Sequence, residues 1–129
     1  MSKINLKQSE RAEQQTLIEW ARLNEHIYPC LRFLHSSLNG EKLTIGQARQ
    51  AVKSGLKKGV PDLCLPRPVD RPNFSRSGLY IEMKTRRGKV STAQQEWLSY
   101  LSAVGYHADV CRSWVEARDE IIRYLTGKE

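Results

Sequence analysis

Apolar residues recur every three or four positions early in the chain, which predicts a helix over residues 9–24. Leu17 and Ala21 lie on its apolar stripe. Glu10 and Glu13 fall on the same stripe one or two turns earlier. An acid on the apolar side of a helix is costly to bury without a partner. We therefore expect the first helix to carry these two acids towards the surface that its apolar side contacts.

Short apolar runs and polar segments follow one another in the middle of the chain. Residues 30–36 are apolar and lie between Pro29 and a turn-forming stretch, which predicts a strand. A second helix is predicted over residues 44–59, with apolar residues on one face and basic residues at four-residue spacing on another. Residues 67–78 are rich in proline and serine and are expected to form a loop.

Two further apolar runs contain charged residues. Residues 62–65 and 79–85 both have the character of strands. The strand period of two sends Glu82 and Lys84 to the same side of the second run. Asp62 opens the first run, directly after a proline. If the two strands are neighbours, two carboxylates and an ammonium group meet at one point of the sheet.

The last third of the chain predicts a helix over residues 91–104, a strand over 107–111 and a final helix over 113–125. Helices that alternate with strands in this way indicate an α/β fold, with a mixed sheet flanked by helices. A chain of 129 residues has the length of one ordinary domain. We therefore expect a single domain over residues 1–129.

Composition narrows the class of partner. Lysine and arginine number 21 against 14 acids, which gives a formal net charge of +7. This excess favours a polyanion such as nucleic acid, and a basic surface that only keeps the protein soluble is the alternative. No apolar run approaches the roughly 20 residues that a membrane span needs. The N-terminal residues also lack the apolar core of a secretion signal, so we expect a soluble, intracellular protein without a membrane partner.

The cysteines and histidines favour structural roles. Cys30, Cys64 and Cys111 are widely spaced among apolar residues, which is typical of reduced core thiols. With no CxxC pair and only three histidines in the chain, we expect no structural zinc site. His35 and His107 are interpreted as structural residues for the same reason.

The cluster of charges predicted at the sheet fits metal-assisted hydrolysis of a phosphodiester. Mg²⁺ and similar hard cations bind one or two carboxylates, with water and substrate phosphate at the remaining positions. Asp62 and Glu82 are the expected ligands. Lys84 would lie beside them and offset negative charge on the attacking and transferred groups. Separate structural roles, with Asp62 at a strand entry and the other two as a surface ion pair, are the alternative.

The pattern of Pro61-Asp62 followed by Glu82-Met83-Lys84 resembles the PD-(D/E)XK nuclease superfamily. The surrounding stretches "SERAEQQTLIEWA", "KKGVPDLCLP", "GLYIEMKTRRGKVSTAQQEWLSYLSAVGY" and "VCRSWVEARDEIIRYL" resemble the VRR-NUC family, in particular its small stand-alone members from phages and prophages. The likeness extends over about residues 9–125, nearly the whole chain. It implies a core like that of restriction endonucleases and a DNA endonuclease that depends on Mg²⁺ or Mn²⁺.

The resemblance also implies residue roles. Asp62 and Glu82 match the metal-binding acids, with the backbone carbonyl of Met83 as a further ligand, and Lys84 matches the catalytic lysine. The acid on the first helix falls on Glu13, directly or through a water, although Glu10 shares its stripe. The polar residue on the following helix falls on Gln94, for which helix capping beside Ser91 is an equal alternative.

Partners follow from the same likeness. It implies a homodimer that cuts branched DNA such as a four-way junction, in the cytoplasm of a bacterial host, as a phage or prophage protein. A DNA-binding module that keeps the fold without turnover is the alternative function. The loop that reads "PNG" in many relatives reads "LNG" here at residues 38–40. The basic residues expected to contact DNA are Arg49, Lys53, Lys57, Lys58, Arg86 and Arg87.

Overall fold

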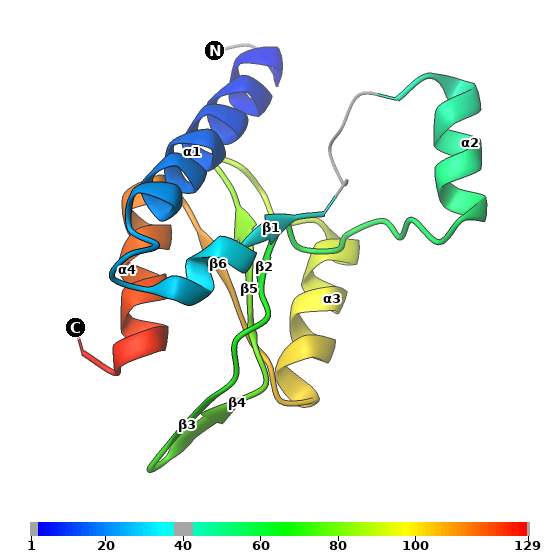
Figure 1. Ribbon diagram of the computed structural model, residues 1–129. Helices are drawn as coiled ribbons and strands as arrows, with labels where there is room; N and C mark the ends of the chain where they lie inside the picture. The colour runs from blue at the N-terminus through cyan, green and yellow to red at the C-terminus, as the bar shows by residue number, and fades with distance from the viewer. Residues whose placement is uncertain (1–2, 38–42, 129) are drawn as a thin grey trace.

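A mixed four-stranded sheet forms the centre of the protein, as the computed structural model shows for residues 3–37 and 43–128 (Figure 1). Its strands are β1 (His35–Ser36), β2 (Leu63–Leu65), β5 (Leu79–Met83) and β6 (His107–Cys111), in the spatial order β1-β2-β5-β6. The first two strand pairs are antiparallel, and β5 and β6 are parallel. The predicted neighbourhood of the two charged strands is confirmed, because β2 and β5 are adjacent.

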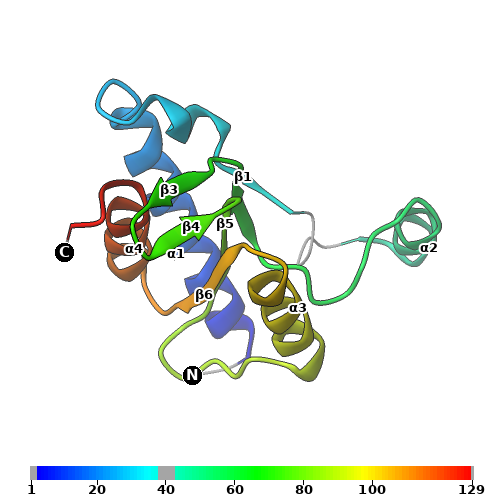
Figure 2. The same cartoon turned by 90° about the horizontal axis from the view of Figure 1, so that it is seen from below.

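Helices cover both faces of this sheet (Figures 1 and 2). The helices α1 (Lys3–Leu23) and α4 (Trp114–Thr126) pack side by side on one face, and α3 (Thr92–Ala103) covers the other face next to β6. Two of the predicted helices are thus confirmed near their expected bounds, and the first helix begins earlier than predicted. In the described part of the chain, no helix is both long enough and apolar enough to cross a membrane.

The register of the strands decides which side chains face which helices. In the parallel pair, Ile81 lies opposite Asp109 and Met83 opposite Cys111, so these residues point to one face. That face carries the main core against α1 and α4. The buried core residues are Leu17, Ala21, Leu31, Leu63, Leu65, Leu79, Ile81, Met83, Cys111, Ala117, Ile121 and Tyr124. Glu82 points to the opposite face, towards α3.

The strand predicted over residues 30–36 is largely wrong. Residues Pro29–Phe33 form a 3₁₀ helix, η1, and only the two residues of β1 pair with β2. Proline is favoured at the start of a helix because its missing N–H needs no partner there. Leu31 and Leu34 donate backbone hydrogen bonds to the carbonyls three residues earlier, and burial of Leu31 holds the turn against the core.

The expected loop over residues 67–78 contains a β-hairpin instead. Its strands are β3 (Val69–Arg71) and β4 (Phe74–Arg76), and they form a separate two-stranded sheet. Pro72 and Asn73 make the turn between them, where asparagine tolerates the left-handed backbone with a φ of 65°. The guanidinium groups of Arg71 and Arg76 lie 4.9 and 4.5 Å from the ring centroid of Phe74, which stabilises the pair of strands.

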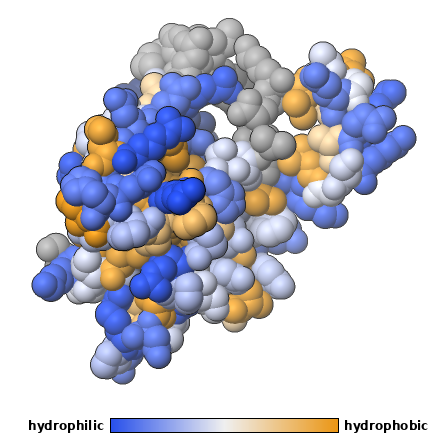
Figure 3. Space-filling view, in the orientation of Figure 1, coloured by the Kyte–Doolittle hydropathy of each residue, from blue (hydrophilic) through white to orange (hydrophobic). Residues whose placement is uncertain are grey.

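The second predicted helix is shorter than expected and stands apart from the sheet (Figures 1 and 2). The helix α2 (Ile45–Lys53) begins at a capping box of Thr44 and ends before Gly55, whose φ of 111° breaks the helix. It contains no buried residue, and Ile45 and Val52 are 75% and 63% exposed. Figure 3 shows hydrophobic side chains among hydrophilic ones on the surface of this arm.

Candidate active site

Asp62 enters the site from the start of β2. Its Oδ2 accepts a hydrogen bond of 2.8 Å from the backbone N–H of Met83, the last residue of β5. The preceding backbone passes very close to α3, because Gly59 has a φ of 95° and a Cβ there would lie 2.6 Å from the carbonyl carbon of Ala93. Only glycine fits this approach without displacing α3. The Gly59–Asp62 segment is thereby held between α3 and β5.

Glu82 projects from β5 on the face that α3 covers, and only 2% of the residue is exposed. Its Oε2 accepts a hydrogen bond of 3.0 Å from Nε2 of Gln94 on α3. Nζ of Lys84 lies 3.8 Å from the same oxygen. The other oxygen, Oε1, is buried and has no hydrogen-bond donor among the described residues. A buried acceptor without a donor is costly, so this oxygen is suited to binding a cation or a proton.

The pKa shifts of Asp62 and Glu82 also favour a cation or a proton at this position. Burial, together with the neighbouring charge of Asp62, raises the pKa of Glu82 to about 8, although the ammonium of Lys84 lowers it. Burial also raises the pKa of Asp62, against the opposing effect of the Met83 amide. The two carboxyl groups lie close enough to share a proton. At neutral pH the metal-free pair therefore holds a proton that a divalent cation can displace.

Gln94 caps α3 and also contacts the Glu82 carboxylate. Its side-chain carbonyl accepts the backbone N–H of Ser91 at 2.9 Å, and its backbone N–H donates to the Ser91 hydroxyl at 3.1 Å. These two bonds complete the capping box of α3. The same side chain donates from its amide nitrogen to Glu82. The cap fixes the rotamer of Gln94 and so aims its N–H at the Glu82 carboxylate.

The first helix brings Glu10 towards these groups. The negative charge of Glu10 raises the pKa of Asp62. A Cβ built on Gly88 would lie 3.3 Å from Oε1 of Glu10 and 3.4 Å from Cδ of Lys84, so both side chains lie against the same glycine. Glu10 is therefore the helix acid beside the catalytic candidates.

Glu13 has a different partner. Its Oε2 accepts a hydrogen bond of 2.8 Å from the backbone N–H of Trp114, the first residue of α4. A carboxylate is favourable there because the first N–H groups of a helix have no partner within the helix. Glu13 thus joins α1 to the start of α4. Of the two acids on this stripe, Glu10 is the one whose charge acts on Asp62 and whose side chain lies beside Lys84.

The segment after Lys84 is held by a residue that the sequence did not single out. Nη1 of Arg112, just after β6, donates to the carbonyls of Thr85 at 2.9 Å and Gly88 at 2.5 Å, with a longer contact of 3.4 Å to Arg86. One guanidinium thereby gathers the turn of residues 85–88. No spacing in the sequence links Arg112 to this turn, since 24 to 27 positions separate the partners.

Comparison with known families identifies the chain. The family model described as the VRR-NUC domain matches residues 7–114, most of the chain. The chain belongs to the VRR-NUC family. A solved structure described as a VRR_NUC domain protein is similar to it, with a TM-score of 0.72 and 23% sequence identity, covering 94% of this chain and 91% of that chain. No curated protein matches the chain.

Membership confirms the expected fold class. The helices α1, α3 and α4 around a mixed sheet, with α2 apart from it, form the PD-(D/E)XK-like fold of VRR-NUC domains. VRR-NUC is a nuclease-related family, and a nuclease domain implies contact with DNA. Of the residues that the sequence points to, the fold brings Asp62, Glu82, Lys84 and Gln94 into one cluster.

The basic residues expected at the DNA lie in two separate places. Arg86 and Arg87 are exposed in the turn that Arg112 holds, directly after Lys84. The other four belong to the α2 arm and the segment that follows it, and all four are exposed: Arg49, Lys53, Lys57 and Lys58. The "LNG" loop of this VRR-NUC domain, at residues 38–40, lies outside the described residues.

Proposed function

We propose that this VRR-NUC protein is a divalent-metal-dependent DNA endonuclease that hydrolyses phosphodiester bonds. The observation that carries the proposal is the buried Oε1 of Glu82, an acceptor without a donor among the described residues, beside the Asp62 carboxyl group. Two carboxylates in a buried place repel each other and the phosphates of DNA unless a cation lies between them. The donor set consists of oxygen atoms, which suits Mg²⁺ or Mn²⁺.

The residues that would hold the ion are Asp62, Glu82 and the backbone carbonyl of Met83. Glu10 takes the place expected for Glu13 and would reach the ion directly or through a water. A divalent cation in such a site polarises the scissile phosphate, lowers the pKa of water and stabilises charge on the leaving oxygen.

The remaining residues act on the charges that this chemistry creates. Lys84, whose Nζ lies 3.8 Å from Oε2 of Glu82, supplies a positive charge towards the attacking water and the transferred phosphoryl group. Gln94 holds Oε2 of Glu82 by its amide N–H and so keeps the carboxylate in one orientation. The Met83 amide does the same for Asp62. These groups are placed before substrate arrives, which reduces the reorganisation needed in the transition state.

Phosphate contacts outside the reacting group are assigned to two regions. Arg86 and Arg87 follow the catalytic lysine and would bind phosphates next to the scissile bond. The basic residues of α2 and the segment after it would contact DNA further away. The chain presents no feature that reads base edges in the described residues, so we propose weak sequence preference.

The finer features of the proposal rest on the family resemblance. We propose that the preferred substrate is branched DNA, and that the protein acts as a homodimer whose two sites suit paired cuts. We also assign it to the cytoplasm of a bacterial host, as a phage or prophage protein. The exposed apolar residues of α2, Ile45 and Val52, offer a surface for association with a second copy.

The experiment that tests the function is cleavage of labelled DNAs (four-way junction, flap, nicked duplex, linear duplex and single strand) in Mg²⁺, Mn²⁺ or EDTA. Lys84→Ala should lower the rate by about 100-fold or more, because it removes a charge that acts in the transition state. Lys89→Ala, an exposed lysine five residues further on, is the matched control and should retain most activity. Cutting that persists in EDTA or in Lys84→Ala would contradict the proposal.

The non-catalytic DNA-binding module predicts a different pattern. Asp62→Ala removes one of two repelling carboxylates, so an enzyme should lose cleavage yet bind DNA in EDTA at least as tightly as before. For a pure binding module, Mg²⁺ should have no effect on the DNA affinity of either the parent protein or the Asp62→Ala variant. Absence of cleavage for every substrate, together with metal-independent binding, would favour the binding module.

A further inference from the structure

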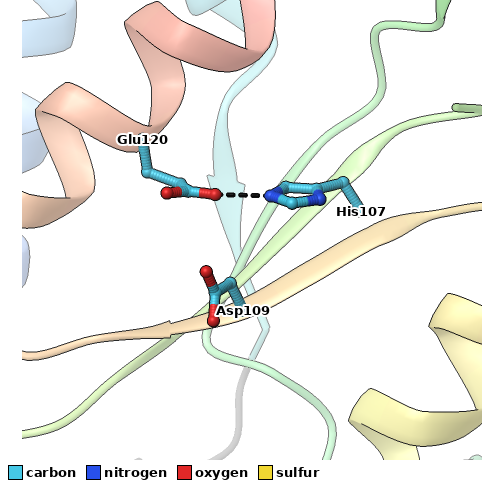
Figure 4. Close-up of side chains that lie close together, drawn as sticks. All are labelled: His107, Asp109 and Glu120. Carbon is cyan, nitrogen blue, oxygen red and sulfur yellow. Dashed lines mark hydrogen bonds and ion pairs between the residues drawn. The ribbon is translucent and has the colours of Figure 1, made fainter. Parts of the chain in front are cut away.

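A second group of metal-ligating side chains lies on the opposite face of the sheet. His107 and Asp109 project from β6, and Glu120 projects from α4 towards them (Figure 4). One ligand atom from each residue lies within 4.8 Å of the other two. The register places His107 and Asp109 on the face of Ile81, whereas Glu82 points to the other face. The group is therefore separate from the proposed catalytic site.

We propose that His107, Asp109 and Glu120 form a second cation site, which takes Zn²⁺ or a similar transition metal and joins β6 to α4. One imidazole nitrogen with two carboxylates is a ligand set that suits zinc, and a water can complete the coordination. Mg²⁺ is a poor occupant, because it prefers six oxygen ligands. The inference does not depend on nuclease activity, and it revises the expectation that the chain has no structural zinc site.

The imidazole is held in position by groups other than the acids. The ring of His107 stacks on Tyr124, with centroids 5.9 Å apart and planes 22° apart. Phe74 meets the same ring edge-on at 5.7 Å. These contacts aim Nε2 at Oε1 of Glu120, with which it makes a short hydrogen bond. Because ring packing sets the direction of Nε2, the ligand would keep its place when a metal replaces the proton between the two atoms.

The local charge also favours a cation, although the protein as a whole is basic. Asp109 and Glu120 bring two carboxylates to the site, and Glu116 is a further acid in the first turn of α4. Arg123 opposes their negative charge, since its Nη2 lies 3.1 Å from Oε2 of Glu120. Arg123 leaves Oε1 of that carboxylate for a ligand bond.

Solvent reaches the site, and one ligand can adjust. Asp109 is exposed, and 27% of the His107 side chain remains exposed. Ligand atoms about 2.0–2.2 Å from a tetrahedral zinc lie roughly 3.3–3.6 Å from one another. The ligand atoms of the three residues lie within 4.8 Å of one another. Rotation of the exposed Asp109 side chain would bring its carboxylate to the shorter separation, and the 2.8 Å hydrogen bond that its Oδ1 accepts from the backbone N–H of Val110 would then break or adjust. The alternative is an ion pair of His107 with Glu120 alone, in which Asp109 has no part.

The test separates the three-residue site from the ion pair. Zn²⁺ binding and thermal unfolding are measured with the Asp62→Asn chain, in which the proposed catalytic site has lost a ligand. We expect one bound Zn²⁺ per chain and a rise in melting temperature that Mg²⁺ at the same concentration does not produce. Adding Asp109→Asn should weaken Zn²⁺ binding at least about tenfold while leaving the His107–Glu120 pair intact. Asp119→Asn, an exposed acid on the same helix, is the matched control and should bind as the parent does.

Two further variants keep the result decisive. His107→Gln should abolish binding, and Arg123→Gln should strengthen it, because it removes the opposing charge. Co²⁺ bound at the site should give the visible bands of nitrogen and oxygen ligands without a thiolate charge-transfer band, which excludes binding by the cysteines. Equal Zn²⁺ affinity of the Asp109→Asn chain and its parent, or no rise in melting temperature with Zn²⁺, would overturn the proposal and leave an ion pair only.

Discussion

Gln94 donates a hydrogen bond of 3.0 Å from its side-chain amide to Oε2 of Glu82, while the carbonyl of the same side chain caps α3 through Ser91. One residue therefore connects the start of a helix to the most buried acid of the described residues. The link is geometric: if the cap is lost, the amide is free to rotate, and the carboxylate loses the group that orients it.

Gln94→Ala should impair both stability and cleavage. The substitution removes half of a capping box and a hydrogen bond to a buried carboxylate, which together cost about 1–2 kcal/mol of unfolding free energy. Cleavage should fall further than the loss of folded protein explains. Gln95→Ala is the control, because Gln95 is exposed and bonds only to the Ser99 hydroxyl at 3.3 Å in the described contacts. Equal effects of the two variants on cleavage would contradict an orienting role.

The raised pKa of Glu82 predicts how the metal-free protein responds to pH. An acid whose pKa is raised to about 8 on folding holds its proton more tightly in the folded chain than in the unfolded chain. Stability in EDTA should therefore fall as the pH rises towards and through 8. The expected loss in unfolding free energy between pH 6 and pH 9 is roughly 2 kcal/mol, measured by urea denaturation.

Glu82→Gln isolates this effect from other titrating groups. The amide cannot ionise, so the difference in stability between pH 6 and pH 9 should shrink by most of that amount. Mg²⁺ should also remove the effect in the parent chain, since it binds the ionised acids and releases their proton. The prediction is contradicted if the stability of the parent chain in EDTA changes between pH 6 and pH 9 by the same amount as that of Glu82→Gln. That result would show that Glu82 is already ionised at pH 6.

The sequence predicts where the charged residues of the two central strands lie better than it predicts the surrounding backbone. The period of two in β5 and the capping pattern at Ser91 are local rules, and both place their residues correctly. The prediction of a strand over residues 30–36 is wrong because a short apolar run suits a buried 3₁₀ turn as well as a strand. The prediction of a loop over residues 67–78 missed the hairpin at residues 69–76, because proline and asparagine mark a turn without showing that the segments on either side pair.

Long-range partners explain the remaining misses. Glu10 and Glu13 share one helical stripe, and only the position of α4 against α1 decides that Glu13 binds the Trp114 amide. Nothing in the sequence distinguishes Arg112 from the other arginines, because its contacts with the turn of residues 85–88 form only in the folded chain. His107 and Glu120 are 13 positions apart on different elements, so their contact depends on how α4 packs on β6. Packing of this kind leaves no periodic trace in the sequence.

Gly59→Ala should be strongly destabilising. The new Cβ would lie 2.6 Å from the carbonyl carbon and oxygen of Ala93, which are backbone atoms of α3, and the φ of 95° strains any L side chain. We expect a loss of about 2–4 kcal/mol in unfolding free energy and a loss of cleavage, because Asp62 lies three residues further on. Gly46→Ala is the matched control.

Gly46 lies in the first turn of α2 with nothing within 4 Å of an added Cβ. Alanine has the higher helix propensity, so this control should leave stability unchanged or raise it by up to about 1 kcal/mol. Chemical denaturation of both variants gives the comparison. A Gly59→Ala chain as stable and active as Gly46→Ala would mean that the approach of residue 59 to α3 is not needed to position Asp62.

Arg112→Lys should lower the rate of cleavage strongly while changing the free energy of unfolding only a little. Nη1 of the guanidinium reaches both the Thr85 and the Gly88 carbonyls, whereas the ammonium of lysine is a compact, strongly hydrated charge on a flexible stem. The turn that carries Arg86 and Arg87 and covers Lys84 should then lose its fixed geometry. We expect cleavage to fall by roughly tenfold or more, with a smaller salt dependence of DNA binding, because fewer phosphates are contacted.

Arg118→Lys provides the comparison for this substitution. Arg118 also pairs through its guanidinium, with Asp119 at 3.0 Å, but it lies on α4, away from the turn of residues 85–88. Its replacement should leave cleavage and salt dependence close to those of the parent. If Arg112→Lys lowers melting temperature and leaves the salt dependence of binding unchanged, Arg112 stabilises the fold without positioning Arg86 and Arg87. A change in salt dependence in the Arg112 variant alone supports the positioning role.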